Sequence, residues 1–259
     1  MAHDNAIVLE HVTCGYRGKT ILKDVSLTIP AGKIVMILGE NGSGKTTLLK
    51  AMAGLISYEG SIKVDGAEVK NLASRERASK ISLLSQMNRA YFSYTVEETV
   101  QMGRYRFHKG LFEGTNQEDI KKVEEFMRKT DVYDIRNERI GELSGGQLQR
   151  VYLSQLYAQE SKYVFLDEPT NHLDLKYRVS LEKELQHSGR SVVAVYHDLM
   201  PAFRMADEII LIKDGKIMKR GTPAVIWNSK AINEAFDMDV ISYLSSDFSP
   251  PGRVDPPDH

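Results

Sequence analysis

The most constraining feature of the sequence is residues 39–55, GENGSGKTTLLKAMAGL, which directly follow the apolar run KIVMIL. Gly39, Gly44, Lys45 and Thr46 match the pattern G-x-x-x-x-G-K-[ST], whose glycines allow successive backbone N–H groups to curl around phosphate oxygens. The apolar run predicts a strand before this loop. The residues after it predict a helix, whose positive N-terminus points at the same anion. A plain glycine-rich turn is the alternative, but the order strand, loop, helix favours a phosphate-binding loop.

The residue types in this loop predict how a nucleoside triphosphate is held. Lys45 is expected to bridge the β- and γ-phosphates, and the Thr46 hydroxyl is expected to be a ligand of Mg²⁺. ATP and Mg²⁺ are therefore the predicted ligands of a segment made of Gly39, Glu40, Asn41, Gly42, Ser43, Gly44, Lys45, Thr46 and Thr47.

A second apolar run, YVFLDEP at residues 163–169, ends in two carboxylates. A buried parallel strand delivers such acids to its C-terminal edge, where ligands of α/β sheets bind. Asp167 is placed to hold Mg²⁺ through water, and Glu168 is placed to polarise an attacking water molecule. Acids after strands also serve as helix N-caps, so it is the phosphate loop that favours the catalytic interpretation.

The order of the predicted elements indicates an α/β fold. Short β-rich runs alternate with amphipathic stretches, and KIVMIL, YVFLD and SVVAVYH are apolar almost throughout. Continuous apolar strands are typical of a parallel sheet covered on both faces by crossover helices. EIILIKDGKIMKRG, residues 208–221, predicts a hairpin that turns at Asp214 and Gly215.

Residues 95–159 carry no convincing strand and several helical periodicities, so we expect them to form a helical insert. The run NQEDIKKVEEFMRKTDV keeps its apolar residues at helical spacing. We expect two i,i+4 ion pairs to support that helix on its solvent-exposed face, Glu118 with Lys122 and Glu125 with Lys129.

The composition limits the partners of the chain. Lys and Arg number 34 against 35 Asp and Glu, a formal net charge of -1, which provides no general attraction to nucleic acid or to an anionic membrane.

The single cysteine, Cys14, cannot form an internal disulfide and is expected to be structural. No run approaches the roughly 18 apolar residues of a membrane span. Residues 244–259, rich in Pro, Asp and Ser, are expected to be a flexible tail.

The stretch ELSGGQLQRVYLSQLYAQ, residues 142–159, identifies a family. Ser144, Gly145 and Gly146 precede an amphipathic helix and present a second helix N-terminus with bare backbone amides. The stretch resembles the signature sequence of the ATP-binding cassette (ABC) family, in which the serine and glycines of one subunit close over the γ-phosphate held by another. Together with Gln147, these residues are therefore expected to contact ATP. In isolation they would indicate an ordinary serine N-cap.

The resemblance implies roles for four further residues. Gln86 matches the glutamine that reaches the metal and the attacking water, and His197 matches the switch histidine that touches the γ-phosphate. Asp174, in NHLD, matches the loop aspartate that meets the opposite subunit, and Tyr16 matches the aromatic on which adenine stacks. Polar surface for Gln86 and a buried edge-strand position for Tyr16 are the alternatives. The implied catalytic residues are Glu168, His197 and Gln86, and the implied metal-binding residues are Thr46, Gln86 and Asp167.

The resemblance also implies a fold, because it covers about residues 7–243 with its motifs in family order. That fold is a P-loop NTPase of the ABC ATPase type, with a RecA-like parallel-sheet core, an antiparallel β subdomain and a helical subdomain. One nucleotide-binding domain, residues 1–243, is expected to contain the helical subdomain at residues 95–159.

Within the family, the sequence is similar to ATPase subunits of importers for iron-siderophore, haem or cobalamin. MGRYRFHKGLF, residues 102–112, is similar to a Gly-Arg-x-Pro-His segment of that subgroup, although Arg106 and Phe107 stand where proline is expected. The similarity implies a transport-coupled ATPase that forms a homodimer at the cytoplasmic face of the cell membrane. Its implied partners are a transmembrane permease dimer and, indirectly, an extracytoplasmic substrate-binding protein, with no nucleic acid. MNRAYFSYT, residues 87–95, is expected either to receive a permease helix or to fill the core.

Two other functions remain open from the sequence. A soluble ABC ATPase acting on DNA or ribosomes is one, although the zinc motifs, coiled-coil insertions and tandem cassettes usual in that class are absent from the sequence. A nucleotide sensor that does not hydrolyse ATP is the other. Glu168 and His197, which hydrolysis needs, argue against it.

Overall fold

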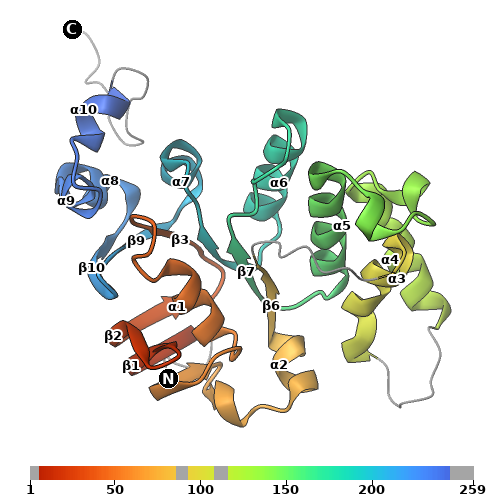
Figure 1. Ribbon diagram of the computed structural model, residues 1–259, viewed down its shortest axis with the longest axis horizontal. Coiled ribbons are helices and arrows are strands. Elements are labelled where there is room, and N and C mark those ends of the chain that lie inside the picture. Colours follow the sequence, from red (N-terminus) through yellow and green to blue (C-terminus); the bar gives the residue numbers. More distant parts are fainter. Residues whose placement is uncertain (1–5, 86–92, 108–115, 246–259) are drawn as a thin grey trace, which may run out of the picture. The chain divides into compact units, whose positions relative to one another are not determined.

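The computed structural model describes residues 6–85, 93–107 and 116–245. The chain forms two compact units, one made of Met1–Asn71 with Leu185–His259 and the other of Leu72–Glu184 (Figure 1). Among the helices of the described ranges, none combines the length and the apolar character that a membrane crossing requires.

An antiparallel sheet forms part of the first unit. It contains β1 (Ala6–Tyr16), β2 (Lys19–Pro30), β4 (Tyr58–Val64) and β5 (Ala67–Glu68), in the order β2-β1-β4-β5. Cys14 lies buried in β1 with a free thiol, and burial raises the pKa of that thiol to about 11. The thiol therefore stays protonated near neutral pH, which agrees with a structural cysteine.

Buried parallel strands form the other sheet of this unit. β3 (Ile34–Leu38) pairs in parallel with β8 (Ser191–Val195) and with β9 (Glu208–Lys213), and every residue of β3 and β8 is buried. The predicted hairpin is confirmed, since β9 pairs antiparallel with β10 (Lys216–Gly221). The helices of the unit are α1 (Lys45–Met52), α7 (Leu199–Met205), α8 (Pro223–Asn228), α9 (Ala231–Ala235) and α10 (Val240–Ser245).

Glu68, at the edge of the antiparallel sheet, carries a carboxylate with several donors. It accepts hydrogen bonds from the Tyr58 hydroxyl at 2.9 Å, the Ser61 hydroxyl at 2.6 Å and the Ile62 backbone N–H at 3.2 Å. Lys70 Nζ lies 3.9 Å away. Burial alone raises the pKa of Glu68, but the hydrogen bonds and the Lys70 charge outweigh it, so the pKa lies below its ordinary value.

We expect Glu68→Gln to lower the free energy of unfolding by about 1–2 kcal/mol at neutral pH, because donors that face a carboxylate lose the charged acceptor. A carboxylate with a depressed folded pKa stabilises the protein above its ordinary pKa of 4.5, and this contribution is lost as the pH falls through the folded value. Urea unfolding of both proteins, from neutral pH down to about pH 2, should therefore show a difference that shrinks in acid. A difference that is constant across this range would contradict the assignment.

Helices dominate the second unit. β6 (Ile81–Leu84) pairs in parallel with β7 (Tyr163–Asp167), and α3, α4 and α5 pack on one another, side by side in Figure 1. The helices are α2 (Ser74–Lys80), α3 (Val96–Gln101), α4 (Gln117–Lys129), α5 (Gly145–Ala158) and α6 (Leu175–His187). Short 3₁₀ helices lie at Val69–Asn71 in the first unit and at Met102–Phe107, Tyr133–Ile135 and Ile140–Glu142 in the second.

The ion pairs on α4 differ from those predicted. Lys122 pairs with Glu125 at 3.3 Å, and Lys129 pairs with Glu184 of α6 at 2.6 Å. An exposed i,i+4 pair contributes only a few tenths of a kcal/mol, so a partner on a neighbouring helix competes easily for the same lysine. The limits predicted for the helical insert, residues 95–159, stay a prediction.

Arg104 connects three parts of the second unit. Its side chain is only 5% exposed, and Nε donates to Asp119 Oδ1 of α4 at 2.8 Å. Nη1 donates to the Ala158 carbonyl at 2.9 Å, at the end of α5, and to the Glu160 carboxylate. The Phe107 ring lies 3.6 Å from the Arg104 guanidinium and 4.0 Å from that of Arg106. The residues that replace the expected proline thus build a stacked cluster around a buried ion pair.

Candidate functional site

The phosphate loop joins β3 to α1 in the first unit. Lys45, 5% exposed, begins α1, and its Nζ donates to the Gly39 carbonyl at 2.8 Å and to the Glu40 carbonyl at 2.7 Å. Ser43 N–H donates to the Glu40 carbonyl at 3.2 Å. The loop is therefore closed on itself by its own lysine, while Asn41, in the same loop, is exposed.

This loop has the shape that a phosphate group needs. The first backbone N–H groups of an α-helix have no partner within the helix, and here they follow a residue with a left-handed backbone, Gly44, at φ 109°. Gly42 has φ +81°, and nothing lies within 4 Å of the position that its Cβ would take. A curled run of amides beside open space fits an anion, so the residues present fit the predicted nucleotide.

Two further predicted residues lie in the same unit. His197 follows β8 and is exposed, and the next residue, Asp198, caps α7 by accepting from Met200 N–H at 3.2 Å. Tyr16 ends β1 with 43% of its surface exposed. That exposure contradicts the alternative of a buried edge-strand tyrosine and leaves the ring accessible for stacking.

The acidic residues end β7 in the second unit. Asp167 is 2% exposed and is the last residue of the strand. Glu168 is half-buried, and its backbone is left-handed, with φ 54°, which is uncommon outside glycine and typical of functional sites. Asn171 Nδ2 donates to Glu168 Oε2 at 2.6 Å. Asn171 is a residue whose role the sequence analysis missed, although its position three residues after Glu168 was a usable signal.

Ser144 begins α5 as its N-cap. Gln147 N–H donates to Ser144 Oγ at 3.3 Å, and Ser144 N–H donates to Gln147 Oε1 at 2.9 Å, which forms a capping box. A Cβ on Gly146 would lie 2.9 Å from the His172 carbonyl. Gln149 Nε2 donates to the Pro169 carbonyl at 2.8 Å. The tip of α5 is therefore held against the segment that follows Glu168.

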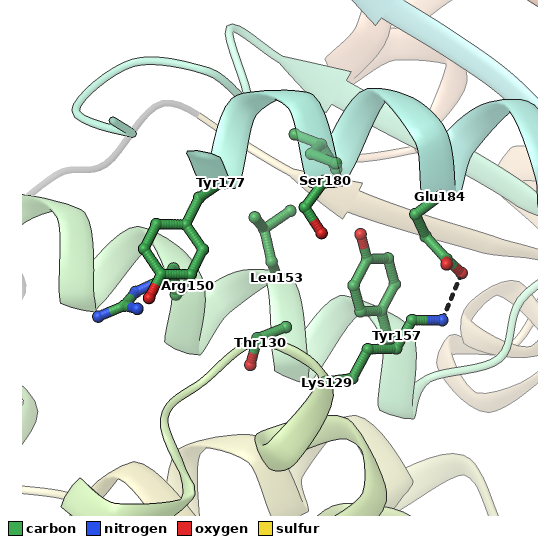
Figure 2. A pocket seen from close by; sticks show the side chains of 9 residues that line it. Lys129, Thr130, Arg150, Leu153, Tyr157, Tyr177, Ser180 and Glu184 are labelled. Atoms are coloured by element: carbon green, nitrogen blue, oxygen red, sulfur yellow. Dashed lines mark ion pairs between the residues drawn. The ribbon is translucent and has the colours of Figure 1, made fainter. Parts of the chain in front are cut away.

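The flank of α5 also contacts α6 (Figure 2). The Arg150 guanidinium lies 4.0 Å from the centre of the Tyr177 ring, and the Tyr177 hydroxyl donates to Asp131. That hydrogen bond, with a smaller contribution from the Arg150 charge, lowers the pKa of Asp131. The cavity among these residues measures about 30 Å³, the space of little more than one water molecule, so it is a packing gap and not a ligand site.

The structure thus gathers the predicted site residues into two groups. The first unit holds residues 39–47, Tyr16 and His197, and the second holds the acids, the start of α5 and Asp174, which accepts from Tyr177 N–H at 3.2 Å. Gln86 and most of residues 87–95 lie outside the described residues. Thr46 and Asp167 offer a hydroxyl and a carboxylate, oxygen donors that suit Mg²⁺, which takes few protein ligands alongside nucleotide phosphates. Within the described ranges, no cluster of three or more His, Cys, Asp or Glu side chains is placed to hold a metal by itself.

Known proteins resemble the chain over most of its length. The petrobactin import ATP-binding protein YclP of Bacillus subtilis (strain 168) is 35% identical, covering 90% of this chain and 94% of that protein. The ferric enterobactin transport ATP-binding protein FepC of Escherichia coli (strain K12) is 34% identical, covering 88% and 86%. A solved dimeric structure of a bacterial ABC transporter cassette has a TM-score of 0.74 and 30% identity, and it covers 84% of this chain and 98% of its own.

The predicted fold class is confirmed by these similarities and by the mixed parallel and antiparallel strands. A profile of the family described as ABC transporter matches residues 22–171, more than half of the chain. The chain therefore belongs to the ABC transporter family, and it is one of that family's ATP-binding and ATP-hydrolysing subunits.

Proposed function

We propose that the chain energises import of an iron chelate, of the siderophore or haem class, through a separate transmembrane permease. The observation that carries this proposal is similarity over most of the chain to two subunits named for petrobactin import and ferric enterobactin transport. An external substrate-binding protein and a position at the cytoplasmic face of the membrane complete the proposal. A soluble ATPase acting on DNA or ribosomes is not favoured by these relatives. Cobalamin as the cargo stays a prediction from the sequence.

The proposed mechanism begins at the phosphate loop. The amides at the start of α1 and the Lys45 ammonium neutralise the triphosphate, and the Tyr16 ring stacks on adenine. Thr46 and Asp167 would hold Mg²⁺, which would supply positive charge to neutralise the charge that develops on the phosphates. His197 donates to the terminal phosphate, and a contact of Gln86, which lies outside the described residues, with the metal and the water stays a prediction from the sequence.

Two copies are proposed to assemble head to tail. The start of α5 in one copy, with Ser144 and its glycines, covers the triphosphate in the loop of the other, and Asp174 contacts the opposite copy. The solved dimeric cassette supports assembly as a pair of copies. Glu168, oriented by Asn171, polarises the attacking water, and loss of the terminal phosphate removes the bridge between the copies. Closing and opening of the dimer is then passed to the permease.

The importer proposal is tested by reconstitution. The chain is incorporated into vesicles with a candidate iron-chelate permease, and uptake of a radiolabelled ferric siderophore is measured with ATP on the side of this subunit. MgATP-dependent accumulation that stops with ADP is the expected result. An ATPase activity stimulated by DNA or ribosomes, with no accumulation of any iron chelate, would favour the other class.

Lys45→Ala is expected to weaken ATP binding by about 100-fold, because a buried charged donor to the phosphates is lost. Its partners in the structure include two loop carbonyls, so a thermal melt of the variant checks that the fold is retained. Isothermal titration with ATP measures the affinity. Lys33→Ala is the matched control, since Lys33 stands before the same strand and pairs with exposed Asp207. Unchanged ATP binding in Lys45→Ala would contradict the role given to this lysine.

A further inference from the structure

Two turns of the first unit have the same sequence and the same backbone. Asp65–Gly66 joins β4 to β5, and Asp214–Gly215 joins β9 to β10. The aspartates both have φ 50° and the glycines both have φ 76°. Each turn therefore requires its glycine for the same local reason, a left-handed backbone.

Their surroundings differ completely. Nothing lies within 4 Å of the position that a Cβ on Gly66 would take, whereas a Cβ on Gly215 would lie 1.8 Å from the Ile21 carbonyl oxygen of β2. A contact below 3.0 Å with backbone cannot be relieved by rotating a side chain, so the turn or the strand must move. Gly215 is thus also required because β2 leaves no space for a side chain at this position.

The atoms that Gly215 approaches belong to β2 and to the phosphate loop. Its N–H donates to the Ser43 carbonyl at 3.1 Å, and its carbonyl accepts from Lys23 N–H at 2.9 Å. Its Cα lies 3.8 Å from the position that a Cβ on Gly44 would take. The turn therefore packs between β2 and the C-terminal half of the phosphate loop.

The same hairpin also contacts the beginning of the loop. A Cβ on Gly39 would lie 2.2 Å from the Ile212 carbonyl oxygen of β9. The next residue, Lys213, anchors the hairpin in turn, since its Nζ donates to the Glu234 carbonyl at 2.7 Å and to Asp237 Oδ1 at 2.5 Å, at and after α9. Both ends of the phosphate loop rest on a hairpin that the C-terminal helices hold in place.

We infer that Gly215 is a positioning residue for nucleotide binding: the Asp214–Gly215 turn sets the backbone of the phosphate loop so that its amides converge before ATP arrives. This inference rests on the proposed role of residues 39–47 in holding the phosphates, and it extends that role to a residue far outside the motif. Displacement of the turn by a side chain pulls Gly215 N–H away from Ser43 and changes the curvature of the phosphate loop. A shift of about 1 Å at such a site is enough to affect function strongly.

The test compares Gly215→Ala with Gly66→Ala in the full chain, with ATP titrated calorimetrically into each. Both variants carry the same strain of a left-handed alanine, so both should lower the thermal midpoint. Only Gly215→Ala should raise the dissociation constant for ATP, by about tenfold or more, while Gly66→Ala should stay within about twofold of the wild type. Equal affinities in the two variants would overturn the inference and leave the proposed function intact. A wild-type chain that binds no ATP would overturn both.

A second pair of variants tests the positioning role of the turn even if Gly215→Ala does not fold. Lys213→Gln removes the anchor of the hairpin without a steric clash, and Lys216→Gln removes the same charge from an exposed position next to the turn. We expect weaker ATP binding, by about threefold, in Lys213→Gln only. Equal loss in both variants would indicate a charge effect and contradict a positioning role.

Discussion

Glu168→Gln should slow ATP hydrolysis by about 1000-fold while leaving ATP binding intact, because glutamine keeps the size of the side chain but cannot accept a proton. The geometry around Glu168 favours this result. The backbone is left-handed and Asn171 Nδ2 donates to one carboxylate oxygen at 2.6 Å, so the side chain is held in a defined orientation. With hydrolysis blocked, the bridging phosphate stays in place. The variant should then elute at twice the monomer mass in size-exclusion chromatography with MgATP.

The control for this experiment is Glu118→Gln, which removes the same charge from an exposed position in the first turn of α4. It should hydrolyse ATP at the wild-type rate and show no stable dimer. A Glu168→Gln protein that stays monomeric far above its ATP dissociation constant would count against the head-to-tail dimer. Turnover at the wild-type rate would reject Glu168 as the residue that polarises the water.

Arg104→Met should lower the free energy of unfolding by about 3–5 kcal/mol, because it leaves the Asp119 carboxylate buried without its guanidinium. The side chains of the pair are 5% and 2% exposed, so water cannot replace the lost partner. Urea unfolding followed by circular dichroism measures the change. Arg128→Met provides the comparison, since Arg128 is exposed on the same group of helices and stacks on the Tyr133 ring. We expect less than about 1 kcal/mol there.

A double variant separates the charge from the packing at this position. Arg104→Met combined with Asp119→Leu removes both charges and should recover most of the lost stability, because an apolar pair of similar size often replaces a buried ion pair without cost. A double variant that is no more stable than Arg104→Met would show that the contacts of Arg104 with the Ala158 carbonyl and the Glu160 carboxylate, and not the pair with Asp119, carry the effect.

The sequence alone predicted those features whose causes are local. Apolar runs predicted β3, β7 and β8, a turn dipeptide predicted the β9–β10 hairpin, and helical spacing predicted α4. Each of these patterns depends on residues that are neighbours in the chain, so a single sequence reveals them. Burial of Arg104 had no such signal, because its partners come from α4 and from the end of α5.

The limits of the sequence are clearest at the two Asp-Gly turns. The dipeptide Asp-Gly, which predicted the turn at Asp214–Gly215, also occurs at Asp65–Gly66, and the structure forms both turns with equal φ values. Only the tertiary fold brings Ser43 and Ile21 against one of them and leaves the other in open space. For the candidate site, the motifs predicted which residues matter, and their contacts with nucleotide and with a second copy stay predictions.

The capping box at the start of α5 has a kinetic consequence. A serine hydroxyl has lone pairs and one hydrogen, and the cap uses only a lone pair, since Gln147 N–H is the donor. In the proposed dimer, Ser144 can therefore give its hydrogen to an incoming phosphate oxygen without releasing Gln147. Docking at this helix end therefore does not require the cap to break, so the speed of assembly should depend on how often the two copies meet in the right orientation.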